Sequence, residues 1–139
     1  MVHRDIEGEI APLCARNGVS ILSYSSLALG LLTGKVGPER TFEGDDLRIS
    51  DPRFSPANRR KAADFAAEIA PIAKAEGATI AELVIAWTIR QPGITFSLCG
   101  ARNPGQAKEN ARAGTIRLGE AELAGISAAA TRHLAGIHG

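Results

Sequence analysis

Hydrophobic residues follow two spacings along this chain, and together they predict helices that alternate with short strands. Apolar side chains three and four residues apart indicate amphipathic helices. We expect one over residues 6–16, one from 56 towards 76, one from 80 past 87, one that starts at 104 and one that begins near 119. Strand-forming residues cluster at Val19–Tyr24 and Thr95–Cys99. This order of elements is typical of an α/β fold.

Start and stop signals flank most of the predicted helices. Starts are indicated by Ser55-Pro56, by the capping box Thr79-Ile80-Ala81-Glu82, and by Asn103-Pro104-Gly105-Gln106. Asn17-Gly18 and Gly77 are stop signals. Because an interior proline removes a backbone hydrogen bond, we expect a kink or an early end at Pro12 and a bend at Pro71.

Residues 25–55 break both spacings and form a long connection. Glycine, proline and aspartate recur there too often for a long regular element. Within it, residues 36–55 form a loop of a length that is uncommon in a compact domain, where such loops are either functional or disordered. The sequence leaves both alternatives open.

Composition and charge narrow the class to a soluble globular protein. The 139 residues suit one domain, 45% are hydrophobic, and 16 basic side chains balance 15 acidic ones. The balanced charge and an aromatic content of 4% argue against a nucleic-acid partner. No apolar run approaches the ~20 residues that span a bilayer, and the N-terminal residues lack a secretory signal pattern. Cys14 and Cys99 fit a reducing compartment, so we expect a cytoplasmic protein with no membrane partner.

Two candidate ligand-binding segments each follow a predicted strand. The first is Tyr24-Ser25-Ser26-Leu27-Ala28-Leu29-Gly30, and the second is Gly100-Ala101-Arg102-Asn103-Pro104, which runs into a capped helix. In parallel sheets, ligands bind at the carboxyl ends of strands. A helix N-terminus beside an arginine suits a phosphate group. The alternative, favoured by the residues alone, is that Asn103 and Gln106 only cap the helix and that Arg102 is solvated.

Other motifs give no support for a catalytic or metal site. Gly30-Leu31-Leu32-Thr33-Gly34-Lys35-Val36 is one residue too short for a phosphate-binding P-loop and lacks its Ser or Thr. His3, His133 and His138 have no metal-ligand spacing with the cysteines. The serines after the first strand lack the glycines of a nucleophile elbow. We expect Arg59-Arg60-Lys61 to form a solvated helix face and Trp87 to lie in the core.

Several segments, in the same order, resemble the C-terminal part of aldo-keto reductases. Val19-Ser20-Ile21-Leu22-Ser23-Tyr24 with the residues through Lys35 resembles the seventh strand and its loop, and Gly100 through Asn110 resembles the segment after the eighth strand. Ala81–Trp87, Leu118–Leu123 and His3-Arg4-Asp5-Ile6-Glu7 are also similar, so the resemblance covers nearly the whole chain.

The resemblance implies part of a (β/α)8 barrel, with residues 1–139 forming a single partial-barrel domain. Family members reduce aldehydes and ketones with NADPH and without a metal. Their four catalytic residues lie before the part that this chain resembles, so no residue here corresponds to a catalytic one, and we expect the chain alone to be inactive.

The resemblance also implies that much of a site for NADP(H) is present. Tyr24 corresponds to the ring that stacks on the nicotinamide; Ser25, Leu27, Gly30 and Lys35 to residues along the pyrophosphate; Gly100 and Arg102 to residues at the 2′-phosphate and adenosine end; and Gln106, Glu109 and Asn110 to helix residues that contact adenosine. Two departures are Ser26, where many members have proline, and Gly119, where a serine would cap the last helix.

Two parallel strands cannot close a barrel, and they would leave an edge and an apolar face exposed. We therefore expect a homo-oligomer or a separate N-terminal half as partner. The alternatives are a structural or interaction protein, or a truncated gene product, that binds no ligand.

Overall fold

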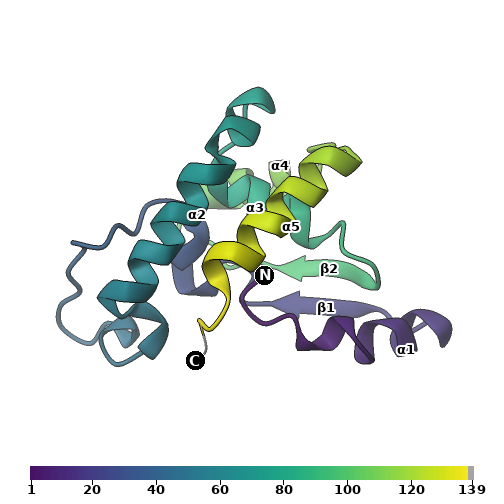
Figure 1. The fold of residues 1–139 in the computed structure, drawn as a ribbon, viewed down its shortest axis with the longest axis horizontal. Helices are drawn as coiled ribbons and strands as arrows, with labels where there is room; N and C mark the ends of the chain where they lie inside the picture. The colour runs from purple at the N-terminus through teal and green to yellow at the C-terminus, as the bar shows by residue number, and fades with distance from the viewer. Residues whose placement is uncertain (138–139) are drawn as a thin grey trace.

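The computed structural model describes residues 1–137 as a layer of helices beside a two-stranded sheet (Figure 1). The helices and strands are α1 (Ile10–Arg16), β1 (Ile21–Tyr24), α2 (Pro56–Ala75), α3 (Ile80–Thr88), β2 (Ile94–Leu98), α4 (Pro104–Ala113) and α5 (Glu120–Leu134). Four short 3₁₀ helices complete the order: η1 (Asp5–Glu7), η2 (Ala28–Thr33), η3 (Leu47–Ile49) and η4 (Pro52–Phe54). The alternation predicted from the sequence is confirmed at this level.

β1 and β2 pair in parallel, and their register determines which residues lie opposite one another. Ser23 is opposite Ser97 and Tyr24 is opposite Leu98, with an irregularity between Ile21 and Leu22. The connection between the strands runs through α2 and α3, as a parallel pair requires. Both strands therefore end at the same side of the molecule.

The core lies among α2, α3 and α5, and it contains the only tryptophan of the sequence. Trp87 is buried, and its Nε1 donates hydrogen bonds to Ser127 Oγ at 3.0 Å and to the Leu123 carbonyl oxygen at 3.3 Å. Residues 81–88 of α3 are all buried, which explains why α3 lacks a polar face. The predicted core position of Trp87 is confirmed.

Capping side chains fix where three of the helices begin. Ser55 Oγ accepts from the Asn58 amide, Thr79 and Glu82 form a complete capping box, and Asn103 Oδ1 accepts from the Gln106 amide. The N-cap of α5 is Gly119, which makes no side-chain cap. The starts predicted from these residues are confirmed because each depends on contacts within one turn of helix.

The N-terminal helix predicted over residues 6–16 is wrong as a single element. The chain forms η1 and then α1, which begins only at Ile10, so Pro12 lies in the first turn of α1, where a missing amide hydrogen costs little. Gly18 has φ +66°, as expected for a stop. The supposed apolar face does not reach the core, since Ile10 and Leu13 are more than half exposed.

Arg59 also departs from the prediction, because its guanidinium packs against the long loop. It donates to the Arg40 carbonyl oxygen and lies 5.9 Å from the centre of the Phe42 ring, while its Nε is buried. The sequence missed this contact because Arg40 and Phe42 lie in the long loop, outside the helical pattern that includes Arg59. Arg60, the next residue, is exposed as expected.

One face of the sheet is apolar and open. Leu22 and Tyr24 of β1 are 54% and 82% exposed, and Phe96 and Leu98 of β2 are 57% and 58% exposed. Alternate residues of a strand point to the same side, and the register places Leu22 opposite Phe96. We call these four residues the open sheet face.

Candidate functional site

The parallel pairing brings the two predicted ligand-binding segments to one end of the sheet. Tyr24 is the last residue of β1, and Leu98, opposite it, is the last residue of β2. The segment from Tyr24 to Lys35 and the segment from Gly100 to Asn110 therefore leave the sheet side by side. This is the edge at which parallel sheets of α/β proteins bind ligands.

The first segment has a left-handed backbone held on apolar anchors. Ser25, Ala28 and Leu29 have φ of 55°, 47° and 53°, values that non-glycine residues rarely adopt, and Gly30 has φ 93°. Ala28, Leu31 and Leu32 are buried in the core and anchor the segment from below.

The predicted ligand residues of this first segment lie mostly at the surface. The Tyr24 side chain, Ser25 and Lys35 are exposed, Gly30 is half-buried, and Leu27 packs against the core. Of this set, the Tyr24 ring offers the largest exposed apolar surface.

The second segment contains the capping bonds that the simpler interpretation required. The Gln106 amide donates to Asn103 Oδ1 at 2.9 Å, and the Arg102 amide donates to Gln106 Oε1 at 2.7 Å. The Arg102 residue is exposed. The capping bonds do not involve the Gln106 side-chain NH2 or the Arg102 guanidinium. Helix capping and ligand binding are therefore compatible here.

Glu109 and Asn110 are also tied to neighbouring elements. Thr79 Oγ1 donates to Glu109 Oε1 at 2.7 Å, and Asn110 Nδ2 donates to the Gly100 carbonyl oxygen at 3.1 Å. Each bond leaves the second atom of the side chain, Glu109 Oε2 or Asn110 Oδ1, as a hydrogen-bond acceptor. Both residues are half-buried on α4.

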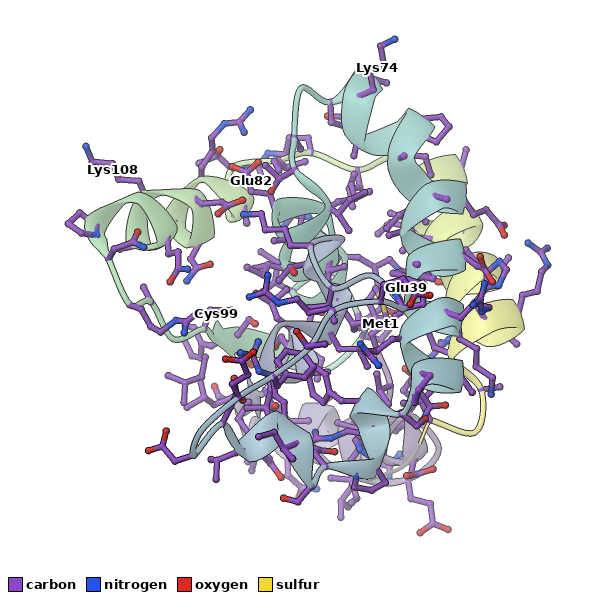
Figure 2. The ribbon with its side chains drawn as sticks, turned by 90° about the vertical axis from the view of Figure 1, so that its left-hand side faces the viewer. Met1, Glu39, Lys74, Glu82, Cys99 and Lys108 are labelled. Carbon is purple, nitrogen blue, oxygen red and sulfur yellow. The ribbon has the colours of Figure 1, made fainter. Side chains whose placement is uncertain are left out.

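An ion pair between buried Glu82 and half-exposed Arg112 holds α4 against α3. Glu82 is buried, accepts from the Thr79 amide at 2.7 Å and receives Arg112 Nη1 at 2.8 Å on each of its oxygens. Arg112 Nη2 also donates to the Gly77 carbonyl oxygen at 2.7 Å. Burial raises the pKa of Glu82, but the Thr79 amide and Arg112 outweigh it, so the pKa is lowered. Figure 2 shows Glu82 between the two helices, whereas Lys108 of α4 points away.

The long loop places charged residues near both segments. Asp46 and Asp51 cap η3 and η4, and each pairs with the arginine two residues later, Arg48 or Arg53. Hydrogen bonds from Arg48 lower the pKa of Asp46 to about 2, and the charge of Arg102 adds to that lowering. The loop therefore lies close enough to the second segment for its charges to interact with Arg102.

Arg53 connects the same loop to the first segment. Its pKa is raised chiefly by its hydrogen bond to Asp51, and Tyr24 lies near enough to add a small electrostatic contribution. Residues of the long loop were not among the site residues predicted from the sequence. The Asp-x-Arg pattern at Asp46-Leu47-Arg48 and again at Asp51-Pro52-Arg53 is the signal that could have found these two capped turns.

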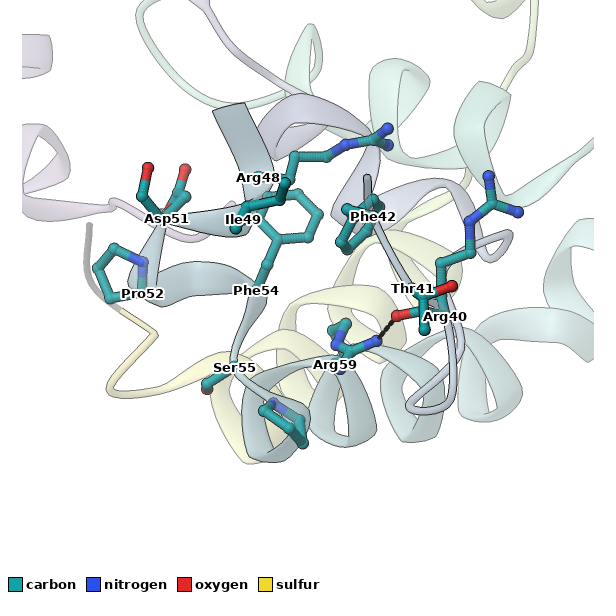
Figure 3. Close-up of a pocket in the computed structure, with 12 residues that line it drawn as sticks. Arg40, Thr41, Phe42, Arg48, Ile49, Asp51, Pro52, Phe54, Ser55 and Arg59 are labelled. Atoms are coloured by element: carbon teal, nitrogen blue, oxygen red, sulfur yellow. Dashed lines mark hydrogen bonds between the residues drawn. The ribbon is translucent and has the colours of Figure 1, made fainter. Parts of the chain in front are cut away.

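A surface pocket of about 440 Å³ opens between this loop and the start of α2 (Figure 3). The rings of Phe42 and Phe54 meet edge to face in it at 5.5 Å, and the Arg48 guanidinium lies 4.2 Å from the Phe42 ring centre. Arg59 closes one side through its bond to Arg40.

Metal ligands do not gather anywhere in residues 1–137: no group of three His, Cys, Asp or Glu side chains lies close enough to hold an ion. His133 Nε2 contacts Glu68 Oε2 at 2.6 Å, and Glu68 also binds Arg132. His138, the third histidine considered in the sequence, lies outside the described residues. Across the described part of the chain, no helix is long and apolar enough to cross a membrane.

Comparisons with known proteins agree on one family. Residues 1–131 match the model of the Aldo/keto reductase family. The chain is 38% identical over 107 residues to "Aldo-keto reductase YhdN" of Bacillus subtilis, covering 76% of this chain and 32% of that protein. It is 33% identical over 122 residues to the "NADH-specific methylglyoxal reductase" of Escherichia coli, covering 88% and 37%.

A solved structure gives the same result for the fold. The glycerol dehydrogenase AKR11B4 from Gluconobacter oxydans matches with a TM-score of 0.83 at 31% identity, over 94% of this chain and 40% of that one. The chain therefore spans about a third to two fifths of the length of these relatives. The α/β architecture expected from the sequence is confirmed.

Proposed function

The chain belongs to the aldo/keto reductase family, as its sequence motifs implied, and we propose that it supplies the cofactor-binding side of a nicotinamide-dependent carbonyl reductase. When bound, the nicotinamide would supply a hydride to a carbonyl carbon. The residues of this chain bind and orient the cofactor and, on this proposal, contribute no catalytic acid.

The observation that carries the proposal is the meeting of the two segments at one end of a parallel sheet. Tyr24 at the end of β1 offers an exposed planar ring, and Arg102 after β2 offers an exposed guanidinium beside the start of α4. A ring suits a nicotinamide, and an arginine beside a helix N-terminus suits a phosphate monoester. The two groups therefore match the two ends of one dinucleotide.

The remaining residues fit the parts of the dinucleotide between these ends. Ser25, Leu27, Gly30 and Lys35 would lie along the pyrophosphate, and Gly100 would lie with Arg102 at the adenosine end. Gln106 keeps an NH2 donor, and Glu109 and Asn110 keep acceptor oxygens, which are the groups that an adenine edge can use. These hydrogen-bonding groups on α4, one donor and two acceptors, thus fit a purine.

We propose NADPH rather than NADH as the preferred form. Arg102 is the positive group that a 2′-phosphate would need, and NADH lacks that phosphate. The E. coli relative is named NADH-specific, so the preference differs among proteins similar to this one. It depends here on one side chain and can be tested by removing it.

The two strands are proposed to be part of a (β/α)8 barrel. The open sheet face is apolar, and a barrel would cover it with the side chains of other strands. A second copy of the chain or a separate N-terminal half could supply such cover, but only the N-terminal half would also bring the catalytic residues of the family.

Titration with NADPH and NADH, followed by nucleotide fluorescence, tests the proposal. We expect saturable binding of NADPH at one site per chain and weaker binding of NADH. Arg102→Ala should weaken NADPH roughly tenfold, the loss of one charge-assisted contact, and leave NADH nearly unchanged. Lys108→Ala, on the outward side of α4, is the matched control and should change neither. Absence of saturable NADPH binding would contradict the proposal.

A second candidate function is that of a structural or interaction protein that binds no nucleotide. The open sheet face favours it, because a large exposed apolar surface marks a protein interaction site whether or not a cofactor binds. On this alternative, Arg102→Ala would change neither nucleotide binding nor assembly.

A further inference from the structure

Four short polar side chains link β1 to β2 directly beneath the first ligand-binding segment. They are Ser23, Ser26, Ser97 and Cys99, which we call the hydroxyl chain. Ser26 Oγ lies 2.7 Å from Ser97 Oγ and 3.3 Å from Ser23 Oγ, and Ser97 Oγ lies 3.3 Å from Cys99 Sγ. Ser26 is only 7% exposed, although many relatives are expected to have proline at its position.

One arrangement of hydrogens satisfies all four contacts of this chain. Ser23 Oγ donates to the Phe96 carbonyl oxygen at 3.2 Å, and a hydroxyl has a single hydrogen. Ser23 must then accept from Ser26, and Ser26 must accept from Ser97. Ser97 in turn accepts from the Cys99 thiol. The hydroxyl chain is thus directional, and it runs from the end of β2 through Ser26 to the Phe96 backbone.

Ser26 lies inside the stretch whose backbone is least favourable. Ser25 before it and Ala28 and Leu29 after it all have φ near +50°. Such a conformation persists only when its surroundings fix it. Ala28, Leu31 and Leu32 fix the far end of the stretch by burial, whereas at the near end the Ser26–Ser97 hydrogen bond joins the stretch to the neighbouring strand.

We propose that Ser26 and Ser97 are positioning residues that hold residues 25–30, where Ser25, Ala28, Leu29 and Gly30 have positive φ, in this conformation and so present them to the cofactor's pyrophosphate. The inference rests on the proposed function for the identity of the ligand, but the tethering itself does not. Proline at position 26 would stiffen the backbone directly; serine achieves the same restraint through a cross-strand hydrogen bond.

The first test compares two nucleotides in Ser26→Ala and Ser97→Ala. NADPH would span residues 25–30, whereas adenosine 2′-monophosphate carries only the end that Arg102 would hold and no part of the pyrophosphate. Losing one hydrogen bond between Ser26 and Ser97 should weaken NADPH roughly three- to tenfold and leave the monophosphate within about twofold. Ser97→Thr keeps the hydroxyl and suits a strand, so it should restore NADPH affinity. Equal weakening of both nucleotides, or no change in either, would overturn the inference.

The second test is amide hydrogen exchange over residues 25–33, which needs no ligand. Exchange should speed up in Ser26→Ala and Ser97→Ala and stay at the wild-type rate in Ser97→Thr and in Ser50→Ala, an exposed serine of the long loop. If the wild-type chain binds neither nucleotide, the proposed function fails, and exchange alone decides the tethering. Unchanged protection in both alanine variants would overturn it.

Discussion

The helical side and the sheet side of this molecule differ in how much of their apolar surface the single chain buries. α2, α3 and α5 bury Phe65, Trp87 and Ile126 almost completely. The single chain leaves Leu13 of α1 and all four residues of the open sheet face more than half exposed. The helical side therefore forms a well-buried hydrophobic core. The sheet side leaves an apolar surface that, on our proposal, another part of a barrel would cover.

The same difference separates the residues that stabilise the fold from those that we propose to bind a ligand. The proposed ligand residues lie after the ends of the two strands and on α4, and the ion pair between buried Glu82 and half-exposed Arg112 connects α4 to the helical side. Substitutions on the helical side should therefore change the free energy of unfolding, whereas substitutions on the sheet side should mainly change binding and association.

The same substitution on the two sides should give the largest difference. Phe65→Ala empties a fully buried position and should lower the free energy of unfolding by about 3–5 kcal/mol. Phe96→Ala, at a position 57% exposed, should cost less than about 1 kcal/mol. Urea unfolding at concentrations low enough to keep the chain monomeric measures both. Equal costs under those conditions would show that the single chain itself buries Phe96.

Breaking the link between the two sides should have an intermediate effect. Glu82→Gln removes a buried carboxylate that binds Arg112, so the free energy of unfolding should fall by about 2 kcal/mol. Glu39→Gln, an exposed carboxylate, is the control and should stay within about 0.5 kcal/mol.

The pH dependence of the same carboxylate gives an independent readout. Folding lowers the pKa of Glu82 from 4.5, so its contribution is complete above the unfolded pKa and is lost as pH falls through the folded pKa. The difference between wild type and Glu82→Gln should therefore shrink as the pH is lowered below 4.5. A difference that is constant down to acid pH would contradict the role assigned to this ion pair.

Removing the cap of α4 should have the smallest effect on stability. Asn103→Ala deletes an exposed N-cap and should cost about 1 kcal/mol in thermal or urea unfolding. Lys108→Ala on the same helix should cost less than about 0.5 kcal/mol. If Asn103→Ala were neutral, α4 would depend on the Glu82–Arg112 pair and not on its own cap.

What the sequence could predict depended on how local the cause was. Caps such as Thr79 with Glu82 act within one turn, so the starts of α2, α3 and α4 were predicted correctly. The break between η1 and α1 was missed because apolar spacing alone could not show that Ile10 stays more than half exposed.

The site followed the same rule. Parallel pairing could be expected from the order of elements, and it brings Tyr24 and Gly100 to one end of the sheet. The environment of Arg59 and the bond between Ser26 and Ser97 join residues far apart in the chain, and no local pattern indicates them. The roles of the ligand residues themselves stay predictions until a nucleotide is titrated.

Light scattering with and without NADPH gives the solution mass of the chain. This measurement tests most directly whether another chain covers the open sheet face. The account predicts an assembly of at least two 14.5 kDa chains, in which the apolar surface of β1 and β2 is covered. A monodisperse single chain that keeps both strands protected from amide exchange would contradict it.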